Sequence, residues 1–522
     1  MGSHVLDNLE SFESFEVGCD EDPLRVQYQN YIACIVVHMN SPSHTHTPVG
    51  VTVIEGDGVG PEVVRQAMAL VDASGASVAW ELAEAGAESF ARGIDSGVPE
   101  ETLDSISRTQ VVLKGPLETP IGHGGKSANV TLRKTFETFA NIRPTRELPG
   151  IITPFSGRGI DLVIVRENVE DLYAGIEHMQ TPNVAQCLKL ISRLGCQRVS
   201  SAAFAVAEAE NRSQVTVATK ANIMKLTEGM FKSEFEDVAA RYPHIQAKHL
   251  LIDNCAHQLV VNPEQFDIVL TTNMNGDIIS DLASGLVGGL GVAPSANIGY
   301  DVAMFEAVHG SAPDIAGKDI ANPTAMILSA VMMLRHIGQF EPAEKLEQAL
   351  FLTLEQGIHT SDIATGEAQG TGAFTAAVME RLGKVSSVPS REHRAFDIAP
   401  VTTAESDVHP GSRTKVGVDV FVESSDPPEQ IAHTLNTVTK NTGFDLKMMS
   451  NRGIQVWPSR GVQPSVVDHF RCRFTLSDAA VWSDEMVLGL LAKIGPSYRW
   501  MHVEKLENHN GALGFTKAQG EN

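Results

Sequence analysis

The chain has 522 residues, of which 43% are hydrophobic and 20% charged, and its formal net charge is −24 at pH 7. This length allows two or three domains with cores of their own, and the acidic balance argues against nucleic acid and anionic membranes as partners. No apolar run is long enough to span a membrane. The six cysteines form no CxxC pair, which favours reduced thiols in a cytoplasmic protein.

Residues 1–49 differ in composition from the rest of the chain. They are acidic and lack the basic start and apolar stretch of a signal peptide. They end in the turn-rich segment NSPSHTHTPVG, and Met39 is a candidate for the natural start. We expect this extension to be mobile and to take no part in the function.

From Val51 onward, strand patterns alternate with helix patterns. Apolar, β-branched runs predict strands at 51–58, 111–117, 161–168 and 214–220. Helical patterns occupy 61–75, 225–243 and 321–338, and the segment 266–289 reads as a strand that runs into a helix. Such alternation predicts an α/β architecture with a largely parallel sheet.

The glycine-rich stretch GDGVGPE, residues 56–62, follows the first predicted strand. The dinucleotide fingerprint of Rossmann folds is GxGxxG. In this chain the third glycine, Gly60, comes one residue too early. A tight turn that closes the strand is therefore the simpler interpretation.

The pattern changes after a linker at 385–414 that is rich in proline and serine. Strand, helix, two strands, helix and strand then follow, which is the order of a ferredoxin-like unit. This part carries no evident catalytic cluster. We expect it to be structural, with small-molecule sensing as the alternative.

Three stretches gather groups that bind anions, namely 126–144, 165–175 and 218–225. Guanidinium groups bind carboxylates through paired hydrogen bonds, so several arginines and a lysine in an acidic chain suit a small polycarboxylate. Taken singly, each arginine fits a surface ion pair equally well. The candidate residues are Ser127, Asn129, Arg133, Arg143, Arg166, Tyr173, Lys220 and Asn222.

A further stretch carries carboxylates. Asp277 and Asp281 are four residues apart on a predicted helix and share one face. With Asp253 they offer the oxygen-only ligands that suit Mg²⁺ or Mn²⁺, although a solvated helix face would look the same. The loop 305–323 has the small and polar residues that suit a ribose and base, and an ordinary surface loop is the alternative.

The motifs SANVTLR, VRENVEDLYAG, TTNMNGDIISDL and EAVHGSAP occur in this order. Together they resemble the β-decarboxylating dehydrogenases and, within that family, the isocitrate dehydrogenases. The resemblance runs from Val51 to about Gly383, and the C-terminal part resembles the extension of the longer bacterial members. It implies the isopropylmalate dehydrogenase-like α/β fold, not a Rossmann fold, with a C-terminal α+β ferredoxin-like domain.

The resemblance also implies a division of the chain into domains. The large, cofactor-binding domain would comprise 50–138 and 288–384. The small domain, with the metal and dimer contacts, would comprise 139–170 and 193–287. A clasp-like segment would occupy 171–192, and the C-terminal domain would occupy 415–522.

Each motif residue acquires a role from the resemblance. Isocitrate would be bound by Ser127, Asn129, Arg133, Arg143 and Arg166. Tyr173 and Lys220 would form the acid–base pair. The metal would be held by Asp253, Asp277 and Asp281, with Lys220 and Asp253 reaching in from the second subunit of a homodimer or higher oligomer. The cofactor would contact Thr119, Asn222, His309, Gly310, Ser311, Ala312, Asp314, Ile315, Ala321 and Asn322.

The substrate is indicated by two of these positions. Isopropylmalate enzymes have apolar residues where Ser127 and Asn129 stand, whereas these polar groups can bond the extra carboxylate of isocitrate. Homoisocitrate and 3-isopropylmalate remain alternatives. A non-catalytic regulatory subunit would lack the catalytic Tyr, Lys or metal Asp, all of which this chain keeps.

The expected cofactor is NAD. Members that use NADP typically have Lys-Tyr after the HGSAP motif, where this chain has Asp314 and Ile315. An ionised Asp314 would accept hydrogen bonds from the ribose hydroxyls and repel a 2′-phosphate. The segment 359–370 also lacks the Tyr and Arg that those members use. Lys318, in the same loop, keeps NADP as the alternative.

Overall fold

The computed structural model describes residues 47–119, 127–391, 393–394, 398, 400–401, 411–459, 461, 464–478 and 480–521. The expectation that residues 1–49 are mobile therefore falls, except for its last three residues, outside the described part of the chain.

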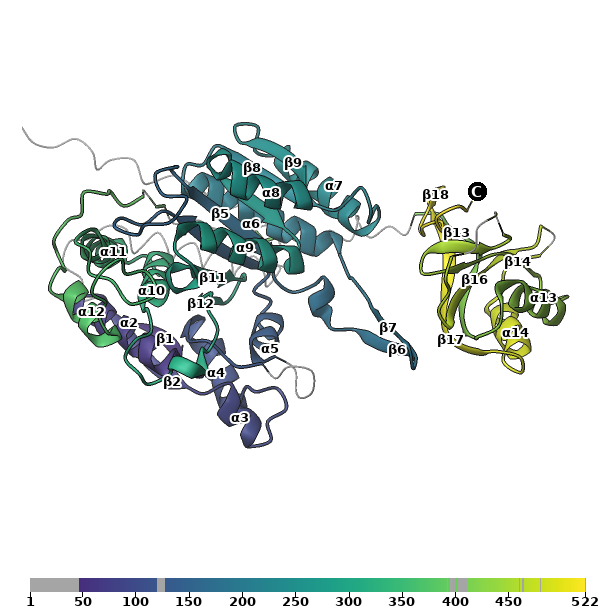
Figure 1. Cartoon of the computed structure of the whole chain (residues 1–522), viewed down its shortest axis with the longest axis horizontal. Coiled ribbons are helices and arrows are strands. Elements are labelled where there is room, and N and C mark those ends of the chain that lie inside the picture. Colours follow the sequence, from purple (N-terminus) through teal and green to yellow (C-terminus); the bar gives the residue numbers. More distant parts are fainter. Residues whose placement is uncertain are drawn as a thin grey trace, which may run out of the picture. The chain divides into compact units, whose positions relative to one another are not determined.

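A ten-stranded sheet organises the described residues up to Ala307 (Figure 1). Its order is β2–β1–β3–β12–β11–β4–β5–β10–β8–β9. The bounds are β1 (Val49–Ile54), β2 (Val78–Ala83), β3 (Val111–Lys114), β4 (Ala140–Arg146), β5 (Asp161–Glu167), β8 (Gln214–Thr219), β9 (Gln246–Leu251), β10 (Ile268–Thr271), β11 (Pro294–Ile298) and β12 (Ala303–Ala307).

The sheet is largely parallel, as predicted, but its centre is antiparallel. The strands β12, β11, β4 and β5 pair antiparallel in succession, whereas the strands on either side pair parallel. The short connection from β11 to β12, residues 299–302, allows only an antiparallel return, because a parallel return needs a long crossover.

Helices cover both faces of this sheet. They are α2 (Gly60–Ala73), α3 (Ala87–Ala91), α4 (Glu100–Thr109), α5 (Ala128–Thr135), α6 (Arg193–Ala209), α7 (Thr227–Ala239), α8 (Ile252–Val261), α9 (Asn273–Val287), α10 (Thr324–His336), α11 (Phe340–Glu355) and α12 (Thr371–Met379). Alternate residues of β5 serve the two faces: Val163 and Val165 belong to the core that includes α6, and Leu162 and Ile164 to the core under α8 and α9. No helix in the described ranges is long and apolar enough to cross a membrane.

A two-stranded hairpin, β6 (Glu177–Thr181) and β7 (Val184–Cys187), stands apart from the large sheet. It follows the 3-10 turn η1 (Leu172–Ala174) and precedes α6. This is the segment that the sequence predicted to be clasp-like.

The C-terminal part forms a second, antiparallel sheet in the order β15–β14–β16–β13–β17–β18. Its elements are β13 (Arg413–Glu423), α13 (Pro428–Val438), β14 (Phe444–Asn451), β15 (Ile454–Trp457), β16 (His469–Leu476), α14 (Asp484–Ile494), β17 (Arg499–His509) and β18 (Ala512–Leu513). Val418, Val420 and Val422 on β13 pack with Leu435 and Leu490 of the two helices. The central strands have the ferredoxin-like order, which confirms that prediction; β15 and β18 are additions.

The glycine turn after β1 is a packing element. Gly56 and Gly58 have φ of +77° and +60°, and a Cβ atom on Gly58 would lie 1.9 Å from the carbonyl oxygen of Ser311. Between them, the Asp57 carboxylate accepts hydrogen bonds from the backbone N–H groups of Ala87 (3.0 Å) and Glu118 (2.7 Å). The turn thus ties β1 to the start of α3 and to the segments that carry Glu118 and Ser311, in keeping with a structural role.

Candidate functional site

The centre of the candidate site is a group of arginines and aspartates at one edge of the sheet. Arg143 on β4 and Arg166 on β5 extend towards α9, where Arg166 pairs closely with Asp277. The Arg143 guanidinium lies 3.5 Å from Asp277 and 3.4 Å from Asp281. Gly276 makes this approach possible, since a Cβ atom there would lie 2.6 Å from Cγ of Arg166.

Burial shapes the charge of this group. Desolvation and the neighbouring Arg166 lower the pKa of Arg143 to about 10, so the Arg143 guanidinium stays charged at pH 7. Burial raises the pKa of Asp281. For Asp277 burial works in the same direction, but Arg166 and the Tyr173 hydroxyl outweigh it and lower the pKa.

Tyr173 lies in η1, against the same aspartate. Its hydroxyl donates a hydrogen bond to Asp277 at 2.7 Å, and the Arg166 guanidinium lies 4.9 Å from the centre of its ring. Burial and the hydrogen bond to Asp277 raise the pKa of Tyr173. The phenol is therefore protonated at neutral pH and is available as a proton donor.

A buried carboxylate that the sequence did not indicate supports Arg133. Glu306, on β12, lies 2.9 Å from Arg133 of α5 and pairs closely with Lys114 of β3. Burial disfavours the charge of Glu306, but Lys114 and Arg133 outweigh burial and hold its pKa well below the usual range. Glu306 thus fixes one face of Arg133, and the three residues come from distant parts of the sequence.

The start of α5 presents polar groups. Ser127 precedes the helix, and its hydroxyl lies 2.9 Å from that of Thr119. Asn129 donates weakly to the carbonyl of Leu117 at 3.4 Å. Its buried side-chain oxygen has no hydrogen-bond partner among the described residues, which is what a site for a polar ligand would leave open.

Lys220 and Asp253 form a separate pair. Lys220 follows β8, Asp253 lies in the first turn of α8, and their charged atoms are 3.0 Å apart. Within the described ranges, no hydrogen bond or ion pair joins either residue to Tyr173 or Asp277. The other expected acid–base, metal and arginine residues lie together in the first group. They are Arg133, Arg143, Arg166, Tyr173, Asp277 and Asp281.

The three aspartates that were expected to bind the metal are divided between the same two groups. Asp277 and Asp281 place oxygen atoms one helical turn apart with side chains 40% and 53% exposed, which fits a hard cation such as Mg²⁺. In the part of the chain that the structure describes, no three His, Cys, Asp or Glu side chains form a metal-binding group. Asp253 therefore does not complete the set within one chain.

A half-buried lysine connects the two groups. Lys189, after the hairpin, lies 2.7 Å from Asp171 and 2.7 Å from Glu228, and both carboxylates are fully buried. Asp171 also accepts from the backbone N–H of Met274 at the start of α9, and Glu228 accepts from the N–H of Lys220 at 3.1 Å. The sequence carries no signal for this bridge, because a single lysine in a polar segment is an ordinary surface feature.

The expected cofactor loop follows β12. The Ser311 hydroxyl donates to Glu118 at 3.1 Å, and Asn322 donates to Asp362 at 3.0 Å. Burial lowers the pKa of His309, so the ring is neutral at pH 7. Its Nε2 atom is buried and has no partner among the described residues, which leaves a polar atom available to a nucleotide.

The other expected cofactor residues differ in burial and in their place in the fold. Ala312 and Asp314 are exposed in or beside the 3-10 turn η4 (Pro313–Ile315), while Ala321 is buried. Asn222 lies in the turn after Lys220, and no hydrogen bond between described residues links it to the His309 loop. The cofactor role of Asn222 stays a prediction.

The chain has close relatives among bacterial proteins. It is 55% identical over 475 residues to a Thermus thermophilus protein named isocitrate dehydrogenase (NADP), covering 90% of this chain and 96% of the relative. It is 40% identical over 489 residues to a Rickettsia bellii protein of the same name, covering 91% and 99%. A crystal structure of a Thermus thermophilus protein matches with a TM-score of 0.88 and 55% identity, covering 91% of this chain and 96% of that chain.

These relatives contradict the expectation of NAD as cofactor. Both are named for NADP and match nine-tenths of this chain, so the inference from Asp314 and Ile315 is wrong. The structure offers a physical reason. The Asp314 side chain is exposed, and Lys318 is exposed in the same loop. The field of one exposed carboxylate is screened by water and salt and is too weak to exclude a phosphate.

The family is established by two sequence profiles. The isocitrate/isopropylmalate dehydrogenase profile matches residues 50–381. The profile of the bacterial isocitrate dehydrogenase C-terminal domain matches residues 413–521. The mixed sheet and the C-terminal antiparallel sheet occupy these same two ranges. The chain therefore belongs to the isocitrate/isopropylmalate dehydrogenase family.

Proposed function

We propose that the chain is an NADP-dependent isocitrate dehydrogenase, which oxidises isocitrate to 2-oxoglutarate with loss of CO₂ and acts as a homodimer. The observation that carries this proposal is the group of three arginines, two of them deeply buried, beside the aspartates of α9. The names of the full-length relatives support NADP as the hydride acceptor.

The arginines favour a substrate with several carboxylates. Arg143 and Arg166 lie in a buried setting, where burial and the repulsion of neighbouring guanidinium groups lower the pKa of each. A bound anion would relieve that repulsion and bond their free N–H donors in pairs. Arg133, held by Glu306, supplies a third such group, so a tricarboxylate would satisfy the site better than a smaller anion.

The start of α5 favours isocitrate over 3-isopropylmalate. Asn129 carries a buried oxygen without a described partner, and Ser127 lies beside it on the same turn. An alkyl group placed there would leave these polar atoms unpaired, which costs binding free energy. A carboxylate can accept from the Ser127 hydroxyl and from the Asn129 amide nitrogen, whose hydrogen bond to the carbonyl of Leu117 is long at 3.4 Å. The Asn129 oxygen is itself an acceptor and would pair with a donor such as the substrate hydroxyl.

Tyr173 and Lys220 would move the protons. Lys220 would take the proton of the substrate hydroxyl as the hydride leaves, and Tyr173, protonated at neutral pH, would donate to the carbon that loses CO₂. Lys220 and Asp253 would come from the second subunit. Asp277, Asp281 and that second Asp253 would hold Mg²⁺ or Mn²⁺, which when bound polarises the substrate oxygens.

The test is a steady-state comparison with the full chain, NADP⁺ and Mg²⁺. We expect kcat/KM for isocitrate to exceed that for 3-isopropylmalate by about 10⁴-fold, because a polar pocket rejects the alkyl analogue strongly. Comparable values for the two substrates would contradict the assignment of Ser127 and Asn129. A lower kcat/KM for NADP⁺ than for NAD⁺ would contradict the proposed cofactor.

A further inference from the structure

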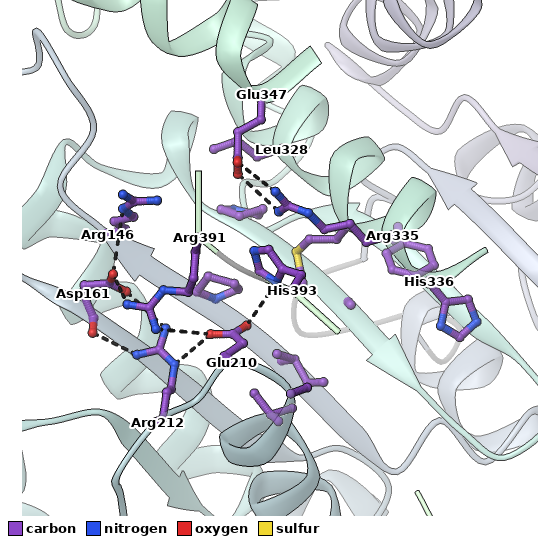
Figure 2. Close-up of a pocket in the computed structure, with 18 of the residues that line it drawn as sticks. Arg146, Asp161, Glu210, Arg212, Leu328, Arg335, His336, Glu347, Arg391 and His393 are labelled. Atoms are coloured by element: carbon purple, nitrogen blue, oxygen red, sulfur yellow. Dashed lines mark hydrogen bonds and ion pairs between the residues drawn. The ribbon is translucent and has the colours of Figure 1, made fainter. Parts of the chain in front are cut away.

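A cavity of about 160 Å³ lies behind the strands that carry the arginine group (Figure 2). On β4, Arg143 belongs to the candidate site, whereas Ile142, Pro144 and Arg146 line the cavity. Successive side chains of a strand point to opposite faces. The cavity and the candidate site therefore lie on opposite faces of the same strand.

The neighbouring strand β11 repeats this arrangement. Asn297 accepts a hydrogen bond from Asn141 at 2.9 Å on the face of the candidate site. Ala296 and Ile298 line the cavity on the reverse face. The cavity thus lies where the two halves of the mixed sheet meet, and it is distinct from the proposed isocitrate site.

The inner wall of the cavity is apolar. α6 contributes Val206 and Ala209, α10 contributes Leu328 and Met332, and Phe305 adds an aromatic ring. An apolar cavity of about 150 Å³ holds one benzene molecule. This wall therefore accommodates one aromatic ring or a short alkyl chain.

Charged side chains stand beside the apolar wall, and cations predominate. Glu347 accepts two hydrogen bonds from Arg335, at 3.2 and 2.7 Å. Figure 2 shows Asp161 and Glu210 each joined to both Arg212 and Arg391. The described lining residues include five arginines and three carboxylates, and each guanidinium has five N–H donors. The lining arginines are Arg146, Arg212, Arg335, Arg391 and Arg394.

The segment after α12 forms one side of this cavity. It is fixed by the hydrogen bonds from Arg146 to the carbonyl of Pro389 (3.2 Å) and from Gln348 to Ser390 (2.8 Å). His393 is half-buried in it, and burial together with Arg335 lowers its pKa to about 4. The ring is neutral at pH 7, so the positive charge of the cavity comes from its arginines.

We propose that this cavity is a binding site for a small monocarboxylate whose apolar body is the size of a benzene ring. The ring would lie between α6 and α10, and the carboxylate would meet the N–H donors of Arg335 and Arg391. A tricarboxylate such as isocitrate would not suit it, because the apolar wall offers no partner for further charges.

Isothermal titration of benzoate into the full chain tests this proposal. We expect one benzoate per chain, with an affinity that saturating isocitrate and Mg²⁺ leave unchanged. Benzyl alcohol should bind about tenfold more weakly, since it lacks the charge-assisted hydrogen bonds. Ala209→Leu, which fills the cavity, should weaken benzoate binding by about tenfold or more. Ala205→Leu, on the same helix but outside the cavity, should not.

A crystal structure of the benzoate complex gives a readout that does not depend on the folding of a variant, and should show the ring against Leu328 and Met332. Displacement of benzoate by isocitrate would place it in the catalytic site and overturn the proposal. Equal affinities for benzoate and benzyl alcohol, or the absence of benzoate from the cavity in the crystal, would do the same.

Discussion

The group around Tyr173 and the pair of Lys220 and Asp253 lie in one chain but are held in opposite ways. In the first, Arg166 is buried, and Asp277 receives bonds from both Arg166 and the tyrosine hydroxyl. In the second, the two side chains are 29% and 65% exposed and share a single ion pair. One group is organised by several contacts within its own chain, whereas the other depends on one ion pair.

This contrast indicates where the proposed second subunit would act. Several hydrogen bonds around the buried Arg166 fix proton and charge positions, even though the side chains of Asp277 and Asp281 are 40% and 53% exposed. An exposed ion pair contributes little fixed geometry, since water screens it. The Lys220 pair would acquire a defined geometry only when another surface covers it. The same contact would bring Asp253 of one subunit to Asp277 and Asp281 of the other and so complete the proposed metal site.

The largest effect is expected from Tyr173, in the group that its own chain organises. Tyr173→Phe removes the proposed proton donor while leaving the arginines in place, so kcat should fall by about 10²- to 10⁴-fold and KM for isocitrate should change little. Tyr242→Phe is the matched control, because Tyr242 packs on Phe204 away from the site. An unchanged kcat in steady-state assays of Tyr173→Phe would remove Tyr173 from the mechanism.

The next largest effect concerns the bridge between the two regions. Lys189→Met leaves Asp171 and Glu228 as buried carboxylates without their cation, and should lower the free energy of unfolding by about 3–5 kcal/mol. Lys232→Met, which removes an exposed i,i+4 pair with Glu236, should cost less than about 0.5 kcal/mol. Urea unfolding of both variants measures the difference.

The pH dependence of that difference follows from the pKa of Lys189. Burial lowers this pKa, but the two carboxylates outweigh burial and raise it above the ordinary value. The stabilisation is therefore complete below the ordinary lysine pKa of about 10.4 and is lost as the pH rises through the raised folded value. A gap between wild type and Lys189→Met that closed near neutral pH would show that Lys189 is not the charged bridge.

The smallest effect is expected from Asp314 in the cofactor loop, because its side chain is exposed to solvent as that of Asp253 is. Asp314→Asn should change the ratio of kcat/KM for NADP⁺ and NAD⁺ by less than about fivefold, since an exposed charge contributes about 0–1 kcal/mol. Steady-state kinetics with both cofactors measures this. A change of about a hundredfold or more would mean that the Asp314 carboxylate lies close to the 2′ position of the bound cofactor's ribose and is not screened there by water.

Much of this arrangement could be predicted from the sequence, because the motif residues are locally clustered. Arg166 and Tyr173 lie in one stretch, and Asp277 and Asp281 lie one helical turn apart. The ferredoxin-like order of the C-terminal domain followed from its alternation of strands and helices. These features depend on contacts that are short in sequence or on a fixed period.

The remaining features depend on contacts that no local pattern contains. Glu306 pairs with Arg133, which is 173 positions away in the sequence. Glu306 and Lys114 each lie in a short strand whose other residues are apolar. The antiparallel centre of the sheet depends on the short connection at 299–302, which resembles any other turn. The cofactor inference failed because the exposure of Asp314, which decides the strength of its field, cannot be read from the residue type.

The most direct test asks whether the two regions serve different active sites. Tyr173→Phe and Lys220→Met are each prepared as inactive homodimers, dissociated, mixed and reassembled. If each site combines Tyr173 of one subunit with Lys220 of the other, each hybrid dimer contains one intact site, and random mixing should restore about one quarter of the wild-type kcat per chain. If the mixture stays as inactive as its parents, Tyr173 and Lys220 act within one chain, and the division of the site between subunits is wrong.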